Sequence, residues 1–235
     1  MSKKLAVVFG GSRGIGAACV NALADDGFDV AYTYVSQPSA TGSAARTYRV
    51  DITTSHLVAQ TFDDVQRDFG RAPDCVVANA GINVPPAPLA QFKPEAFRQL
   101  VEVNLVGAFN ILAEAARRVA DGGTIIALTT SLVRHAAPGL GPYSATKAAV
   151  ECLVRSLAKE LASRQVRVNA VAPGPVDTDL FRAGKTEEAK QRSAAMSPFN
   201  RVGQPHEVAQ VVAFLASDKA SWVHGQIVQP NGGLI

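Results

Sequence analysis

A tyrosine and a lysine stand four residues apart in the segment Tyr143-Ser144-Ala145-Thr146-Lys147. On a helix, this spacing places both side chains on one face. A phenol with a pKa near 10 is a poor proton donor or acceptor at pH 7. A neighbouring ammonium group favours the phenolate and lowers that pKa toward the working range. The pair therefore indicates acid–base chemistry, although such pairs also arise by chance on many helices.

A glycine-rich segment, Gly10-Gly11-Ser12-Arg13-Gly14-Ile15-Gly16, lies between an apolar run at 5–9 and a stretch with helical spacing. Glycines permit a tight turn and let backbone N–H groups approach a pyrophosphate, and the N-terminus of the following helix adds a partial positive charge. The spacing differs from the usual G-x-G-x-x-G, so a plain glycine-rich turn is the alternative. Its position at the first strand-to-helix turn favours dinucleotide binding.

The end of the second expected strand indicates which dinucleotide binds. Sites for NAD usually place an acid there to accept a hydrogen bond from the ribose 2′-hydroxyl. Here the sequence reads Tyr32-Thr33-Tyr34-Val35-Ser36, without an acid, and Arg13 supplies a cation for a 2′-phosphate. The sequence therefore predicts a preference for NADP(H) over NAD(H), with a solvated loop cation as the alternative for Arg13.

Short β-like runs alternate with longer helix-like stretches along the chain. We expect strands at 5–9, 30–35, 48–50, 75–78, 124–130, 166–171 and 227–228, and helices at 15–25, 56–69, 97–119, 144–164 and 207–217. This alternation predicts βαβ units with right-handed crossovers. The expected fold class is α/β: a single doubly wound Rossmann-type domain over residues 1–235, with a central parallel sheet and helices on both faces.

The segment 177–200 is less regular and interrupts this alternation. It carries Leu180, Phe181, Met196 and Phe199 among charged residues. That pattern is typical of a mobile lid with an apolar inner face, which would suit a hydrophobic carbonyl substrate. A surface helical hairpin with no role in substrate binding is the alternative.

The composition excludes several classes of protein. The chain has 235 residues, of which 47% are hydrophobic and 18% charged, and a formal charge of +3. It is therefore not a disordered chain, and its charge gives no reason to expect nucleic-acid or membrane partners. Three cysteines without C-x-x-C spacing and four scattered histidines predict neither a disulfide scaffold nor a metal site. The apolar run after Lys4 is too short for a signal peptide, so the expected location is the cytoplasm.

Taken in order, the motifs resemble those of the short-chain dehydrogenase/reductase family, and most closely its 3-oxoacyl-carrier-protein-reductase-like members. The matched segments are the loop at 10–16, Asp51, Ala78-Asn79-Ala80-Gly81, Asn104, Thr129-Thr130-Ser131, Tyr143-x-x-x-Lys147 and Pro173-Gly174-Pro175-Val176-x-Thr178. Each motif alone is weak, but the ordered set is highly specific and covers residues 4–235.

The resemblance implies reversible hydride transfer between the nicotinamide cofactor and a small carbonyl compound, which is reduced to its alcohol. Tyr143 would protonate the carbonyl oxygen, and Lys147 would lower the Tyr143 pKa and bind the nicotinamide ribose. Asn104 would hold a water in a proton relay. A hydroxyl at the end of the fifth strand would bind the substrate oxygen.

The resemblance also implies the cofactor contacts: Asp51 to the adenine, 79–81 to the adenosine ribose, and Val176 and Thr178 to the nicotinamide carboxamide. The full expected set is Gly10, Ser12, Arg13, Gly14, Ile15, Gly16, Thr33, Asp51, Ile52, Asn79, Ala80, Gly81, Tyr143, Lys147, Pro173, Gly174, Val176 and Thr178. Members of the family pair through the two long helices and the C-terminal strand region, which implies a homotetramer.

Three departures from the family pattern stand out. Phe9 replaces a threonine before the first glycine, and Ala78 replaces an asparagine. The family commonly has its catalytic serine thirteen residues before the tyrosine, which is the position of Thr130. Ser131 lies one residue nearer, and a shift of one residue reverses the face of a strand. We expect Ser131, because serine is the usual residue type, with Thr130 as the alternative.

Two other functions are weighed against the reductase. A non-catalytic NADP(H)-binding sensor or scaffold would share the fold, but it would not need Asn104, Ser131, Tyr143 and Lys147 together. A sugar-nucleotide epimerase would carry a further substrate domain, for which the length leaves no room.

Overall fold

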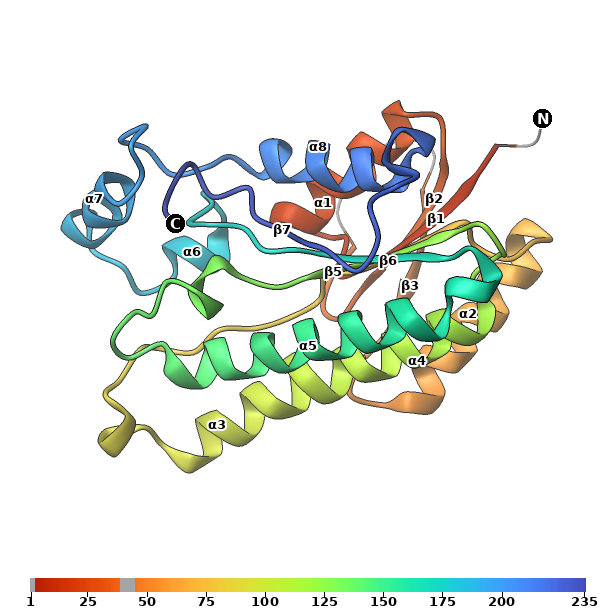
Figure 1. The fold of residues 1–235 in the computed structure, drawn as a ribbon. Helices are drawn as coiled ribbons and strands as arrows, with labels where there is room; N and C mark the ends of the chain where they lie inside the picture. The colour runs from red at the N-terminus through yellow and green to blue at the C-terminus, as the bar shows by residue number, and fades with distance from the viewer. Residues whose placement is uncertain (1–2, 39–44) are drawn as a thin grey trace.

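A single parallel sheet forms the centre of the computed structural model, which describes residues 3–38 and 45–235 (Figure 1). In that part of the chain, seven strands follow the order β3-β2-β1-β4-β5-β6-β7. Their bounds are β1 (Leu5–Phe9), β2 (Asp29–Tyr34), β3 (Ala45–Arg49), β4 (Cys75–Ala78), β5 (Thr124–Leu128), β6 (Arg167–Val171) and β7 (Ile227–Val228).

Helices cover both faces of the sheet (Figure 1). One face carries α1 (Gly14–Asp25) and α8 (Pro205–Ala216), and the other carries α2 (Ser55–Phe69), α4 (Ala108–Arg118) and α5 (Gly141–Glu160). The expected doubly wound Rossmann-type domain is thus confirmed. The remaining short elements are η1 (Leu89–Gln91), α3 (Pro94–Leu100), η3 (Ser131–Val133), η4 (Ala162–Arg164), α6 (Asp179–Arg182), α7 (Glu187–Ala195) and η5 (Asp218–Ala220).

Strand β1 shows why the central strands are apolar without interruption. Its residues Leu5, Val7 and Phe9 pack in the core beneath α2, α4 and α5, whereas Ala6 and Val8 pack beneath α1 and α8. A strand that is buried on both faces has no position for a polar side chain. Phe9 lies against Phe62 of α2, with ring centroids 5.5 Å apart. The residue that replaces the family's threonine therefore belongs to the core.

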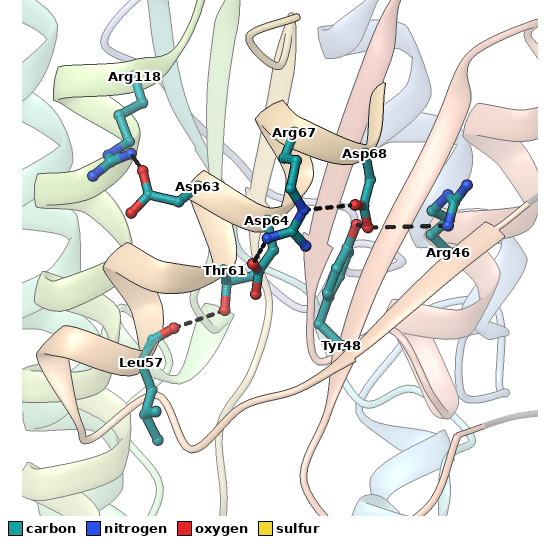
Figure 2. Close-up of polar contacts among 9 residues, drawn as sticks. All are labelled: Arg46, Tyr48, Leu57, Thr61, Asp63, Asp64, Arg67, Asp68 and Arg118. Atoms are coloured by element: carbon teal, nitrogen blue, oxygen red, sulfur yellow. Dashed lines mark hydrogen bonds and ion pairs between the residues drawn. The ribbon is translucent and has the colours of Figure 1, made fainter. Parts of the chain in front are cut away.

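Polar contacts fix the outer helix α2 between β3 and α4 (Figure 2). The Tyr48 hydroxyl of β3 donates a hydrogen bond to Asp68 at 2.9 Å, and Arg118 of α4 pairs with Asp63. Burial and the carboxylate of Asp68 raise the pKa of Tyr48 above its ordinary value. Tyr48 is thus a structural tyrosine.

Two sequence predictions about element bounds are wrong. The helix expected at 97–119 is interrupted by η2, a π-helical segment at Val101–Gly107. Its Asn104 directs its side chain to another part of the chain, and π segments often occur at functional sites. The strand expected to reach residue 130 ends at Leu128. Here the Thr130 hydroxyl accepts the N–H of Leu132 and so begins the turn η3.

Candidate active site

The loops after β1 and β4 lie in contact at the carboxyl end of the sheet. A side chain at Gly10, whose φ is +79°, would meet the Ala80 backbone at 2.8 Å, and one at Gly16 would meet the Gly10 carbonyl at 2.0 Å. The Asn79 side-chain amide donates to the Gly10 oxygen at 2.8 Å. Because β1 and β4 are neighbours whose following helices cover opposite faces, this is the switch point at which such sheets bind ligands.

The start of α1 can accept an anion. Arg13 stands at its N-cap position in extended conformation, and neither a capping side chain nor a first-turn acid competes for the free N–H groups there. Thr33, expected to contact the cofactor, supports the loop: its hydroxyl accepts the Gly10 N–H and its carbonyl accepts the Gly11 N–H, both at 3.0 Å. The cradle therefore fits the pyrophosphate of a dinucleotide.

Two guanidinium groups are available near the end of β2. Arg13 is exposed, and its guanidinium makes no hydrogen bond or ion pair with a residue that the structure describes. Arg49 donates from Nε to the Val35 carbonyl at 3.0 Å, which places it beside the end of β2. The sequence prediction missed Arg49, although a cation at the end of the third expected strand could have indicated it.

The turn after β3 separates two residues that were expected to bind the cofactor. Asp51 is exposed, and its carboxylate accepts hydrogen bonds from the Thr53 N–H at 3.0 Å and the Thr53 hydroxyl at 2.8 Å. Ile52 is buried, and a side chain at Gly107 would meet it at 2.6 Å. Asp51 is thus free to meet an adenine, whereas the Ile52 side chain packs against η2.

Helix α5 carries the tyrosine and the lysine to the same end of the sheet. Lys147 is 6% exposed, and its ammonium donates to the Leu128 carbonyl at 2.9 Å. A side chain at Gly81 would lie 3.0 Å from Asn104 Oδ1 and 3.3 Å from Lys147 Nζ. Gly81, Asn104 and Lys147 therefore meet, although they come from three segments of the chain.

The side-chain amide of Asn104 forms hydrogen bonds with two other segments of the protein. Its Oδ1 accepts the Ile82 N–H at 2.8 Å, and its Nδ2 donates to the Ile82 carbonyl at 2.9 Å and to the Thr146 hydroxyl at 3.4 Å. Both N–H donors are used. The amide thus ties the segment after β4 to α5, a positioning role that the sequence prediction did not include.

Burial shifts the pKa of both members of the tyrosine–lysine pair toward the neutral form. It raises the pKa of Tyr143 to about 12 and lowers the pKa of Lys147 to about 8. The Tyr143 pKa is thus raised by burial, not lowered by the neighbouring ammonium as the sequence predicted, and Tyr143 is a protonated phenol at neutral pH, as a general acid must be. Most Lys147 side chains still carry the ammonium charge at pH 7.

We expect the substitution Lys147→Met to show this burial cost as pH-dependent stability. The unfolded chain has the ordinary lysine pKa of 10.5 and so binds more protons than the folded chain between pH 8 and 10.5. The Lys147 contribution to the free energy of unfolding therefore rises with pH in this window. The free energy of unfolding of K147M minus that of the wild type should fall by about 2 kcal/mol between pH 7 and 10. Urea titrations measure it, and a constant difference would contradict the assignment.

The two hydroxyls at the end of β5 differ in what they can donate. Ser131 is fully buried, and its hydroxyl donates to the Ala172 carbonyl at 2.7 Å. The Thr130 hydroxyl accepts the Leu132 N–H at 3.3 Å and donates to no residue that the structure describes. A hydroxyl has one hydrogen to donate. Of the two, the geometry therefore favours Thr130 as donor to a substrate oxygen.

The loop after β6 closes the site from the other side. The Pro173 carbonyl accepts the Ser131 N–H at 2.9 Å. Thr178 accepts the Phe181 N–H at 3.1 Å, and a side chain at Gly14 would meet the Thr178 methyl at 3.2 Å. The loop thus reaches the glycine-rich turn. It contains four residues expected to bind the cofactor: Pro173, Gly174, Val176 and Thr178.

The described residues bring together no group of three histidine, cysteine, aspartate or glutamate side chains that could hold a metal ion. Across 3–38 and 45–235, no helix has both the length and the apolar composition needed to cross a membrane.

A doubly wound parallel sheet, a glycine-rich turn at its switch point, and a tyrosine–lysine pair on α5 whose buried Lys147 lies by Gly81 are the features of a dinucleotide-binding α/β protein. Residues 10–235 match the family model described as enoyl-(acyl carrier protein) reductase. A short-chain type dehydrogenase/reductase of Picea abies is 40% identical over 99% of this chain and 92% of its own. The chain therefore belongs to the short-chain dehydrogenase/reductase family of oxidoreductases.

Two further relatives agree with this membership. An NADPH-dependent aldehyde reductase-like protein, chloroplastic, of Arabidopsis thaliana is 38% identical over all of this chain and 95% of its own. The crystal structure of a dehydrogenase/reductase from Sinorhizobium meliloti 1021 superimposes with a TM-score of 0.90 at 32% identity, covering all of this chain and 96% of that one.

Proposed function

We propose that this protein is an NADP(H)-dependent oxidoreductase that reversibly converts an aldehyde or ketone into the alcohol. The observation that carries the proposal is the meeting of Lys147, Asn104 and Gly81 beside the glycine cradle, with Tyr143 one helical turn before Lys147. The NADPH-dependent aldehyde reductase-like protein among the relatives supports the reaction class and the cofactor.

The residues of the site can perform the proton chemistry of this reaction. The bound cofactor supplies a hydride to the carbonyl carbon. Tyr143 donates its proton to the carbonyl oxygen, and the Thr130 hydroxyl donates a hydrogen bond to the same oxygen as negative charge develops there. The ammonium of Lys147 stabilises the phenolate that remains, and solvent returns the proton. Reversal of these steps oxidises the alcohol.

The residues that would hold the cofactor lie on α5, at the end of β3, and in the loops that follow β1, β3, β4 and β6. The backbone of 10–16 and the start of α1 would bind the pyrophosphate, Asp51 the adenine, and 79–81 the adenosine ribose. Lys147 would bind the nicotinamide ribose, and Val176 and Thr178 the carboxamide. Arg13 and Arg49 would bind the 2′-phosphate, whose charge and geometry suit guanidinium groups.

The substitution Arg13→Ala tests the cofactor preference. We expect the Kd for NADPH to rise about 10–100-fold, because a charge-assisted hydrogen bond contributes about 1.5–3 kcal/mol. The Kd for NADH should change less than about threefold, since NADH has no 2′-phosphate. Nicotinamide fluorescence titrations measure both constants.

A separate assay tests the proposed reaction itself. The absorbance of NADPH and of NADH is followed while the protein is mixed with each of a panel of aldehydes and ketones.

Arg98→Ala is the matched control, because Arg98 is an exposed arginine on α3 that lies 4.0 Å from Glu95. Equal affinity of the wild-type protein for NADH and NADPH would contradict the cofactor proposal. Cofactor binding without turnover of any carbonyl compound would favour the non-catalytic sensor.

We also propose that 177–200 covers the substrate. This segment contains α6 and α7, which lie together at one end of the molecule (Figure 1). Leu180, Met196 and Phe199 are exposed apolar residues within it. Their position next to the loop of Val176 and Thr178 supports a hydrophobic or aromatic carbonyl substrate, and Phe181→Ala should then raise the KM.

A homotetramer is the proposed assembly. A groove of about 320 Å³ between α4 and α5 is lined by apolar residues such as Phe109, Leu112 and Leu153. Phe109 is 52% exposed, and Trp222 near the C-terminus is 97% exposed. Large exposed apolar side chains mark interaction surfaces, and sedimentation velocity measures the assembly.

The three cysteines are free thiols, which supports a reducing compartment such as the cytoplasm.

A further inference from the structure

Helix α5 carries a buried carboxylate that the proposed chemistry does not use. Glu151 is 2% exposed and lies two helical turns after Tyr143. Nη1 of Arg134 donates to its two carboxylate oxygens at 3.2 and 3.1 Å. The Thr129 hydroxyl lies 3.3 Å from Oε1 and 3.4 Å from the Val171 carbonyl, and these two acceptors share its one hydrogen. Nη1 of Arg155 lies 3.9 Å away. Burial of an ionised carboxylate is costly unless such partners compensate it.

These contacts bind both sides of the turn that holds the candidate hydroxyls. Thr129 immediately precedes Thr130, and Arg134 follows the end of η3. On its other side, the turn is bonded to β6 and the loop after it, through the Thr129 N–H to Val171 and the Ser131 N–H to Pro173. The turn therefore lies between the loop after β6 and α5, and Glu151 links it to α5.

An apolar residue could fill the position of Glu151 without the cost of a buried charge. A carboxylate adds directed hydrogen bonds to two side chains of the turn. Because Glu151 and Tyr143 belong to one continuous helix, a turn that is fixed to Glu151 is also fixed relative to the phenol. Catalytic groups must keep their separation closely, and a misplacement of about 1 Å can cost about 100-fold in rate.

We propose that Glu151, together with Arg134, is a positioning residue that holds Thr130 at its working distance from Tyr143. The proposal rests on the oxidoreductase function proposed above. Glu151 touches neither substrate nor cofactor in this scheme. It acts through the backbone of the turn that begins at Thr129.

Kinetics of Glu151→Gln and Arg134→Gln test the proposal. We expect kcat for carbonyl reduction to fall about 10–100-fold in each, with the Kd for NADPH within about twofold of the wild type. Arg134→Lys should retain most activity, because it keeps the cation. Arg155→Gln is the matched control: Arg155 lies near the same carboxylate but belongs to α5 and does not hold the turn, so its kcat should not change.

Two further measurements separate positioning from a general loss of stability. In a Thr130→Ala background, Glu151→Gln should lower kcat no further, because the group it positions is gone; an equal loss in both backgrounds would overturn the proposal. Glu151→Gln should also speed amide exchange at Ser131 and Leu132 without changing exchange within α5. Unchanged exchange at those amides would overturn it as well. If the wild type reduces no carbonyl compound, the proposed function fails, and the exchange result alone decides whether Glu151 holds the turn.

Discussion

Replacing Tyr143 by phenylalanine is expected to lower kcat for carbonyl reduction by about 10²–10⁴-fold, the usual contribution of a general acid. The ring stays in place, but the proton that must reach the substrate oxygen is lost. The Kd for NADPH should stay within about threefold of the wild type, because the glycine cradle and Lys147 are unchanged. The Tyr143 hydroxyl bonds to no residue that the structure describes, so we expect no loss of stability. Nicotinamide absorbance and thermal melting measure these effects.

Tyr48→Phe is the matched control for this substitution. It removes a phenol of the same kind, but one that donates to Asp68 of α2 at the β3 edge of the sheet (Figure 2). It should lower the free energy of unfolding by about 1 kcal/mol and leave kcat unchanged. Undiminished turnover in Tyr143→Phe would contradict the mechanism, and equal losses in both variants would point to a structural cause.

Replacing Thr130 by alanine is expected to lower kcat by about 10²–10³-fold, the usual cost of removing one donor to a developing oxyanion. Thr130 has the hydroxyl hydrogen that remains available, since Ser131 donates its own to the Ala172 carbonyl. Thr130→Ser should restore most of the activity, because serine keeps the hydroxyl. Steady-state kinetics on any carbonyl compound that the wild type reduces will measure both.

Ser131→Ala should lower the stability of the protein and have a smaller effect on kcat than Thr130→Ala. It leaves the Ala172 carbonyl without its hydrogen bond in a buried position, so the free energy of unfolding should fall by about 1–3 kcal/mol while kcat stays within about tenfold. If Ser131→Ala loses activity and Thr130→Ala does not, Ser131 is the catalytic hydroxyl, as its residue type predicted.

The strands and helices nearest the cofactor were predictable because burial there leaves a strong pattern. The runs at 5–9 and 75–78 are β1 and β4 with the predicted bounds, since a strand that packs on both faces must be apolar throughout. The Gly10–Gly16 segment was predictable for a related reason. Its glycines avoid steric clashes with Ala80 and the Gly10 carbonyl that any side chain would create. Thr33 was predicted to bind the cofactor, and the sequence did not predict that its hydroxyl also supports the loop.

Long-range hydrogen bonds determined what the sequence could not predict. The helix expected at 97–119 contains the π segment η2, where Asn104 bonds to Ile82, more than twenty residues away. Similarly, Glu151 is a polar residue within an amphipathic helix. Only its contacts with Thr129 and Arg134 distinguish it from a surface carboxylate.

By itself, the sequence determined the fold class, the phosphate cradle and the tyrosine–lysine pair. Each of these depends on residue type and on spacing within one short segment, where steric and helical rules apply locally. Only the tertiary structure distinguished the hydrogen bonds of Thr130 from those of Ser131 and brought Arg49 to the end of β2. The physical reason is that a hydroxyl or guanidinium has several possible partners. The partner that it finds depends on which distant backbone groups the fold brings within hydrogen-bonding distance: for Ser131 the carbonyl of Ala172, and for Arg49 that of Val35.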